Sequence, residues 1–187
     1  LLIDEPRTYE LIENMFSTLA ECFTSRKIHI GMDEAFMVGL GNYRTKHGIC
    51  DRYDLLVRHL NKVVEIAKKY NFHPMMWSDM FFRMSNNGEY YVNKTEIPED
   101  VISKIPDVSL VYWDYYHRHK MDYANMIKAH KQFNKDIWFA GGAWTWNGFA
   151  PSNDITLKTM KPAMDACREN GVNQIFLFAF HIFLAKN

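Results

Sequence analysis

The sequence has no excess of charge of either sign, because its 22 basic residues are balanced by 22 acidic ones among 187. A nucleic-acid-binding surface would need a local basic cluster, and none stands out. The sequence also lacks a long apolar run. The most apolar stretch, residues 175–184, is about half of the ~20 residues that a membrane-spanning helix needs. We therefore predict neither a nucleic-acid partner nor a membrane association.

Cysteine is scarce as well, since the chain has only Cys22, Cys50 and Cys167. Their odd number and wide spacing argue against a disulfide framework or a zinc site, and we predict three reduced, buried residues. We expect no cofactor and no metal. No signal peptide is visible, but in an internal fragment this absence says little, so the location is left open with a cytoplasmic one favoured. The chain opens on Leu1 without a Met, and we expect it to be an internal fragment.

Aromatic residues are abundant by contrast, with 13 Phe, 10 Tyr and 5 Trp. Many of them are expected in the core, but Trp near a strand end can also stack on a sugar ring. Apolar periodicity predicts helices at residues 7–23, 55–67, 98–105, 123–133 and 154–170, the last interrupted or kinked at Pro162. Short apolar runs predict strands at residues 27–32, 72–78, 108–115, 136–140 and 174–180. Strands that are apolar on both faces and alternate with amphipathic helices indicate parallel β/α units.

Five strands are too few for a closed eight-stranded barrel, which takes ~250 residues, and an open doubly wound sheet fits the count equally well. The carboxyl ends of the strands favour the barrel, because four in succession carry polar or aromatic groups: Asp33 and Glu34, Trp77 and Asp79, residues 113–116, and Trp144 and Trp146. No glycine-rich phosphate loop follows any strand. We predict a single α/β domain over residues 1–187, a partial (β/α)8 TIM barrel that lacks its first strands.

The run His-Ile-Gly-Met-Asp-Glu at residues 29–34 resembles the signature of family 20 glycoside hydrolases, the β-N-acetylhexosaminidases. In that family a His-x-Gly-x-Asp-Glu run ends the fourth barrel strand. Residues 75–80 and 111–116 resemble the fifth and sixth strands, so the chain would cover roughly strands 4–8. It departs from the family at strand 8, because residues 177–183 contain neither the Trp nor the acidic residue that bind sugar hydroxyls there.

Adjacent carboxylates cannot easily stand on opposite sides of a glycosidic bond, as the usual acid and nucleophile do. The resemblance implies a different division of labour, in which the 2-acetamido group of the substrate is the nucleophile and an oxazolinium intermediate forms. Glu34 would protonate the leaving oxygen and then activate water. Asp33 would accept the acetamido N–H and stabilise the charge that develops there. The expected reaction is retaining hydrolysis of terminal β-linked GlcNAc or GalNAc.

The resemblance also implies a substrate pocket. Tyr115, with Tyr116 as the second choice, would orient the acetamido oxygen. Asp79 would bind a sugar hydroxyl or brace Glu34, and His29 is expected to be structural or to lie behind the site. The predicted walls of the pocket are four tryptophans, Trp77, Trp113, Trp144 and Trp146. The expected partners are N-acetylhexosamine-terminated glycans or oligosaccharides, and the chain by itself is expected to be poorly soluble or inactive.

Two alternatives remain open at the level of sequence. One is a non-catalytic sugar-binding barrel, which would not require Asp33 and Glu34. The other is a metal-assisted barrel hydrolase that uses Asp33, Asp79 and Asp114, although no clustered histidines support it.

Overall fold

The computed structural model describes residues 2–92 and 94–179, and these form two compact units. Unit 1 comprises residues 1–90 and 95–110, and unit 2 comprises residues 91–94 and 111–187. The predicted single domain over residues 1–187 stays a prediction.

Unit 1 contains two complete parallel strands and five helices among its described residues. The strands β1 (Lys27–His29) and β2 (His73–Trp77) pair in parallel, with Lys27 opposite His73 and His29 opposite Met75. The first two residues of β3 (Ser109–Trp113) follow at the end of the unit. The helices are α1 (Pro6–Cys22), α2 (Asn42–His47), α3 (Arg52–Lys69), α4 (Asp79–Ser85) and α5 (Glu99–Lys104).

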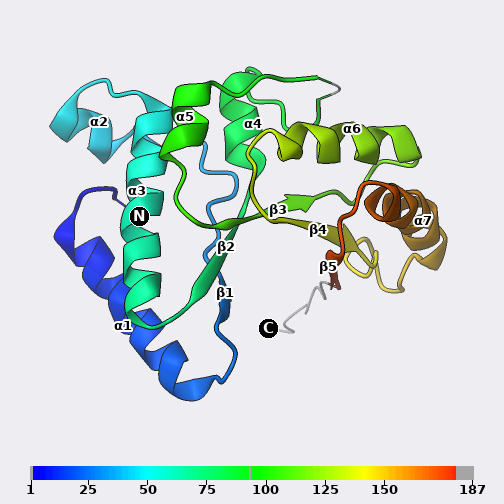
Figure 1. Cartoon of the computed structure of the whole chain (residues 1–187), viewed down its shortest axis with the longest axis horizontal. Coiled ribbons are helices and arrows are strands. Elements are labelled where there is room, and N and C mark those ends of the chain that lie inside the picture. Colours follow the sequence, from blue (N-terminus) through cyan, green and yellow to red (C-terminus); the bar gives the residue numbers. More distant parts are fainter. Residues whose placement is uncertain (1, 93, 180–187) are drawn as a thin grey trace. The chain divides into compact units, whose positions relative to one another are not determined.

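One core cluster of unit 1 lies between α1, α3 and the start of β2, with α1 and α3 side by side (Figure 1). Helix α1 has Pro6 in its first turn, where the missing N–H costs no helical hydrogen bond. Helix α3 begins after Asp51, whose side chain accepts the backbone N–H of Asp54 at 2.9 Å. Ile12 and Phe16 of α1 are buried against α3, as the helical period predicts.

Strand β1 is shorter than the predicted 27–32, because the backbone turns into left-handed conformations directly after it. Gly31, Met32 and Glu34 have φ values of 74°, 80° and 46°. Hydrogen bonds to β2 continue a little further, from the Ile30 N–H to the Met75 carbonyl at 2.8 Å and from the Trp77 N–H to the Gly31 carbonyl at 3.0 Å. The residues that follow are irregular, and they include Asp33 and Glu34.

Unit 2 contains the rest of β3, then α6 (Lys120–Lys131), β4 (Ile137–Gly142), α7 (Asn153–Glu169) and β5 (Gln174–Phe178). Strands β4 and β5 pair in parallel, with Trp138 opposite Gln174 and Gly142 opposite Phe178. In each unit, strands that follow one another in the sequence are neighbours in the sheet. The described β/α order confirms the predicted parallel units.

The core of unit 2 is aromatic. Tyr112, Tyr123 and Phe139 are fully buried, and their rings meet edge to face. His130 is buried with them and hydrogen-bonds through Nδ1 to the Met126 carbonyl at 2.7 Å. Burial lowers the pKa of His130 to about 4, so its ring is neutral at pH 7.

Several details differ from the sequence predictions. Helix α7 continues through Pro162 without an interruption, and the predicted alternative of a kink there stays a prediction. Helices α2 and α4 were not predicted, and Phe180 of the predicted last strand lies outside the described residues, as do residues 181–187. All three cysteines are free, but only Cys167 is buried, whereas Cys22 is exposed on α1 and Cys50 is half-buried. The prediction of three buried cysteines was therefore wrong for two of them.

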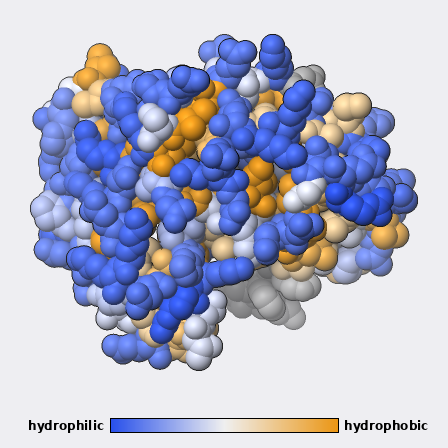
Figure 2. All heavy atoms as spheres, viewed as in Figure 1, coloured by the Kyte–Doolittle hydropathy of each residue, from blue (hydrophilic) through white to orange (hydrophobic). Residues whose placement is uncertain are grey.

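Large apolar side chains are exposed at separate places along the described part of the chain. The face seen in Figure 2 is mostly hydrophilic, with apolar side chains visible in separate groups. Leu11 and Met15 belong to the apolar pattern of α1, yet each is more than half exposed. The apolar face of α1 is thus wider than the surface that α3 covers. No helix in the described part of the chain is both long and apolar enough to span a membrane.

Candidate active site

The two predicted catalytic carboxylates lie in the irregular segment after β1, and both side chains are exposed. The side chain of Glu34 is 54% accessible. Among the described residues, none donates a hydrogen bond to the Asp33 carboxylate. Both groups are therefore available to a ligand, and Asp33 retains its full capacity to accept a hydrogen bond.

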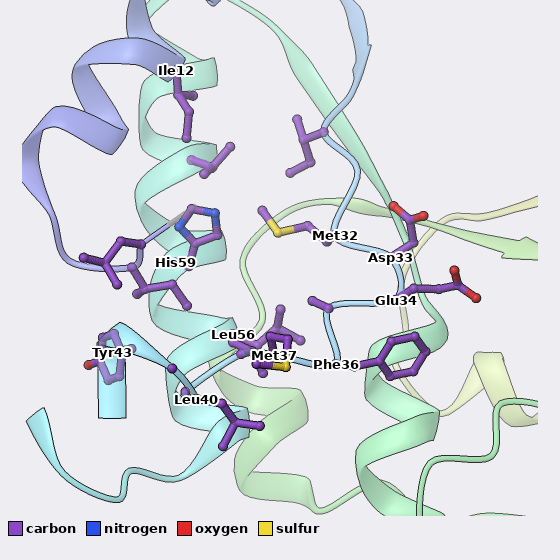
Figure 3. Close-up of a pocket in the computed structure, with 18 of the residues that line it drawn as sticks. Ile12, Met32, Asp33, Glu34, Phe36, Met37, Leu40, Tyr43, Leu56 and His59 are labelled. Carbon is purple, nitrogen blue, oxygen red and sulfur yellow. The ribbon is translucent and has the colours of Figure 1, made fainter. Parts of the chain in front are cut away.

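A cavity of about 940 Å³ lies beside these carboxylates within unit 1. Its wall is largely apolar and comes from α1, the segment after β1 and α3, with Ile12, Met32 and Leu56 as examples. Figure 3 shows Asp33 and Glu34 at one margin, with their carboxylates pointing away from Met32 and His59. The two carboxylates thus lie at the margin of a largely apolar hollow, whose wall also includes the polar groups of Tyr43 and His59.

Asp79 and Arg83 both contact Glu34, Asp79 at its backbone N–H and Arg83 at its carboxylate. Asp79 is fully buried at the start of α4, and its Oδ2 accepts the Glu34 backbone N–H at 3.0 Å and Arg83 Nε at 3.0 Å. Burial raises the pKa of Asp79, and these two hydrogen bonds oppose the rise. Of the two roles predicted for Asp79, these contacts fit bracing Glu34, and binding of a sugar hydroxyl stays a prediction.

His29 and Trp77 lie together beside this segment. Their rings are 4.4 Å apart at a tilt of 51°. His29 Nδ1 accepts the Gly31 backbone N–H at 3.1 Å, which places the ring against the turn after β1. Burial lowers the pKa of His29 to about 4, and Asp33 opposes this shift. A neutral ring that supports the backbone agrees with the structural role predicted for His29.

In unit 2 the structure brings together five of the predicted binding residues, which come from the carboxyl ends of β3 and β4. Tyr115 stacks on Trp113 with centroids 5.6 Å apart and meets the edge of Trp146 at 5.5 Å. Trp144 stacks on Trp146 at 5.0 Å and meets Tyr116 at 5.8 Å. This aromatic cluster offers flat apolar surface of the kind that stacks on a sugar ring.

The loop that carries Tyr115 and Tyr116 is fixed by Asp114. Its buried carboxylate accepts backbone N–H groups through Oδ1, from Tyr116 at 3.0 Å and from His117 at 3.3 Å. Oδ2 binds the Tyr112 hydroxyl and His117 Nδ1, each at 2.7 Å. Asp114 thus has a structural role, which the metal-assisted alternative did not anticipate.

The His117–Asp114 pair makes the stability of unit 2 depend on pH. The hydrogen bond to Asp114 raises the pKa of His117 above its ordinary 6.5, so the pair contributes most below pH 6.5 and loses its contribution as the pH rises through the folded pKa. We expect His117→Gln to lower the free energy of unfolding by about 1 kcal/mol or less at pH 5.5, and by less at pH 9. Urea unfolding at both pH values measures this, with exposed His119→Gln as the control. An equal loss at both pH values would contradict it.

Sequence reasoning missed Arg83, and it missed the roles of Asp114 and His117. An acidic and a basic residue four apart, as Asp79 and Arg83 are, pair on a helix, but α4 was not predicted. The choice between Tyr115 and Tyr116 as the acetamido-binding hydroxyl stays a prediction. Among residues 2–92 and 94–179, no group of three His, Cys, Asp or Glu side chains is placed to hold a metal ion.

Comparison with known families agrees with these features. A model of the glycosyl hydrolase family 20 catalytic domain matches residues 1–133. The chain belongs to glycosyl hydrolase family 20. The match includes Asp33, Glu34, Asp79 and Arg83 and ends before β4, so the family 20 model does not reach Trp144 or Trp146. A comparison with curated protein sequences found no match.

Two solved structures are similar to this family 20 chain. It is similar to a GH20 exo β-N-acetylglucosaminidase from Vibrio harveyi, solved with N-acetylglucosamine, at a TM-score of 0.53 and 15% identity over 97% of this chain and 28% of that one. A Flavobacterium johnsoniae chitobiase gives a TM-score of 0.49 and 13% identity over 94% of this chain and 25% of that one. The chain thus spans little more than a quarter of the first of these proteins. The first likeness confirms the predicted α/β fold, a partial (β/α)8 barrel.

Proposed function

We propose that this chain is the acid–base part of an exo-acting β-N-acetylhexosaminidase that removes terminal β-linked GlcNAc or GalNAc with retention of configuration. Membership of family 20 supports a glycosidase of the β-N-acetylglucosaminidase type. The observation that supports the finer proposal most directly is the pair of adjacent, exposed carboxylates at the end of β1.

The adjacency of Asp33 and Glu34 decides which mechanism we propose. Two carboxylates on neighbouring residues cannot easily flank a glycosidic bond, which favours a mechanism in which the substrate takes one of the usual roles. We assign proton transfer to Glu34, which gives its proton to the leaving oxygen and later takes one from water. The acetamido oxygen forms the bond to the anomeric carbon as the leaving group departs with its electron pair. Asp33 then accepts the acetamido N–H and stabilises the positive charge of the oxazolinium.

We propose that the aromatic cluster of unit 2 and Trp77 bind the sugar. Indole and phenol rings present apolar faces to the C–H groups of a pyranose. Tyr115 or Tyr116 supplies a hydroxyl for the acetamido oxygen. These assignments rest on the family resemblance and on the cluster within unit 2.

The full-length protein that contains this chain provides the test. We expect its kcat/KM for para-nitrophenyl N-acetyl-β-glucosaminide to exceed that for para-nitrophenyl β-glucoside by at least about a thousandfold. The reason is that an intramolecular nucleophile reaches an effective concentration of about 10⁵–10⁸ M, and the glucoside has none. The two substrates share a leaving group, so spectrophotometry compares them directly. Equal rates would overturn substrate assistance.

A further inference from the structure

Arg83 lies on the short helix α4, and contacts from several surrounding residues fix its guanidinium. Its Nε donates to Asp79 Oδ2 at 3.0 Å, and its Nη1 donates to the Gly88 carbonyl at 2.9 Å. The guanidinium also lies over the rings of Phe36 and Tyr90, at 5.2 and 5.7 Å from their centroids. Only 16% of the side chain is accessible. Two hydrogen bonds and two ring contacts therefore fix the orientation of the guanidinium plane.

This orientation directs the remaining nitrogen at Glu34. Arg83 Nη2 is 3.4 Å from Glu34 Oε1, while Glu34 donates its own backbone N–H to the same Asp79 oxygen that receives Arg83 Nε. Asp79 and Arg83 thus contact Glu34 at both ends, its backbone and its carboxylate. A surface ion pair would give neither a buried partner nor a second point of contact.

Glu34 needs such support because its own surroundings supply little. It follows a three-residue strand, its φ of 46° lies in the left-handed region, and its side chain is 54% accessible. A free glutamate of this kind samples several rotamers, whereas proton transfer requires the carboxyl within hydrogen-bond reach of one oxygen. Fixing that rotamer in advance removes the entropic cost from the reaction step.

We propose that Arg83 is a positioning residue for Glu34, which holds the carboxyl in the orientation for proton transfer and neutralises its charge once the proton has left. This inference rests on the proposed function of Glu34 as the acid. Asp79 anchors Arg83 in this arrangement, and the ring of Phe36 packs against the guanidinium.

The test compares two leaving groups in the full-length protein. Acid assistance matters for phenyl N-acetyl-β-glucosaminide, because phenol is a poor leaving group. It hardly matters for dinitrophenyl N-acetyl-β-glucosaminide (the dinitrophenyl substrate), because the dinitrophenolate anion leaves without protonation. We expect Arg83→Met to lower kcat/KM for the phenyl substrate by about 10- to 100-fold, which is at or below the lower end of the ~10²–10⁴-fold range for acid–base catalysis, and for the dinitrophenyl substrate by less than about threefold. Arg83→Lys, which keeps the charge but not the fork of donors, is expected to lie between wild type and Arg83→Met.

The control is Arg168→Met, which removes an exposed arginine from a surface ion pair with Asp165 and is expected to leave both substrates unaffected. Equal losses on the two substrates in Arg83→Met would show that Arg83 acts only through folding and would overturn the inference. Unchanged kinetics would overturn it as well.

A structural measurement separates this inference from the proposed function. We expect crystal structures to show one Glu34 side-chain conformation in the wild type and a displaced or multiple conformation in Arg83→Met or Arg83→Lys. An unmoved Glu34 would overturn the positioning role whatever the turnover. A wild type without activity on either aryl substrate would instead overturn the proposed function, while the Glu34 conformation still decides the role of Arg83.

Discussion

Replacing Glu34 with Gln is expected to lower kcat for phenyl N-acetyl-β-glucosaminide by about 10²–10⁴-fold, the range over which a positioned acid or base accelerates a reaction. Glutamine keeps the size of the side chain and can accept the contact from Arg83 Nη2, but it has no acidic proton to give. The loss is expected to be smaller with the dinitrophenyl substrate. Steady-state kinetics of the full-length protein measure both.

The fold is not expected to suffer from this substitution, because the Glu34 side chain is more than half accessible. Thermal unfolding of Glu34→Gln should therefore match that of the wild type. Exposed Glu10 on α1 provides the control, and Glu10→Gln is expected to keep full activity. Turnover like that of the wild type in Glu34→Gln would refute the assignment of Glu34 as the acid.

Asp33→Asn gives the second large effect, an expected loss of about 10²–10³-fold in kcat on the same substrate. This range is the loss in kcat that follows removal of one preorganised group that stabilises developing charge in a transition state. Asp33 has no hydrogen-bond donor among the described residues, so its carboxylate is free to face the charge that develops on the acetamido nitrogen. An amide supplies neither the negative charge nor a second equivalent acceptor.

Substrate preference separates this effect from the loss of the acid. The role of Asp33 exists only when the substrate has an acetamido group, so Asp33→Asn should narrow the ratio of kcat/KM between the N-acetylglucosaminide and the glucoside. Exposed Asp107→Asn is the control and should leave the ratio unchanged. An unaltered ratio in Asp33→Asn would argue that Asp33 has no part in activating the acetamido group.

The β/α order could be predicted because most helices and strands have a local pattern of apolar residues in the sequence. Helix α3 shows apolar residues at helical spacing, and all of its apolar face is buried as expected. Helix α4 was missed for a physical reason, since Met80, Phe81 and Phe82 are consecutive and all fully buried. A short run of consecutive apolar residues shows no helical period, and its neighbours in space decide its conformation.

The sequence likewise predicted some features of the candidate site and missed others. Asp33 and Glu34 are adjacent in the chain, so their proximity and the family signature could be found without a structure. The residue at which β1 ends could not be predicted from the sequence, because the left-handed conformations at Met32 and Glu34 occur at residue types that rarely adopt them. The aromatic cluster was predicted as a set of residues, but the stacking of Trp144 on Trp146 was not.

The sequence by itself determined the parallel β/α units, the carboxylate pair and the aromatic strand ends, because each depends on residues that are close in the chain. Only the tertiary structure decided how Glu34 is held. Asp79 and Arg83 are 45 and 49 residues away from it in the sequence. Both lie on α4, and the packing of this helix brings them to the end of β1. Contacts over such separations depend on how strands and helices pack, and no local pattern in the sequence encodes that packing.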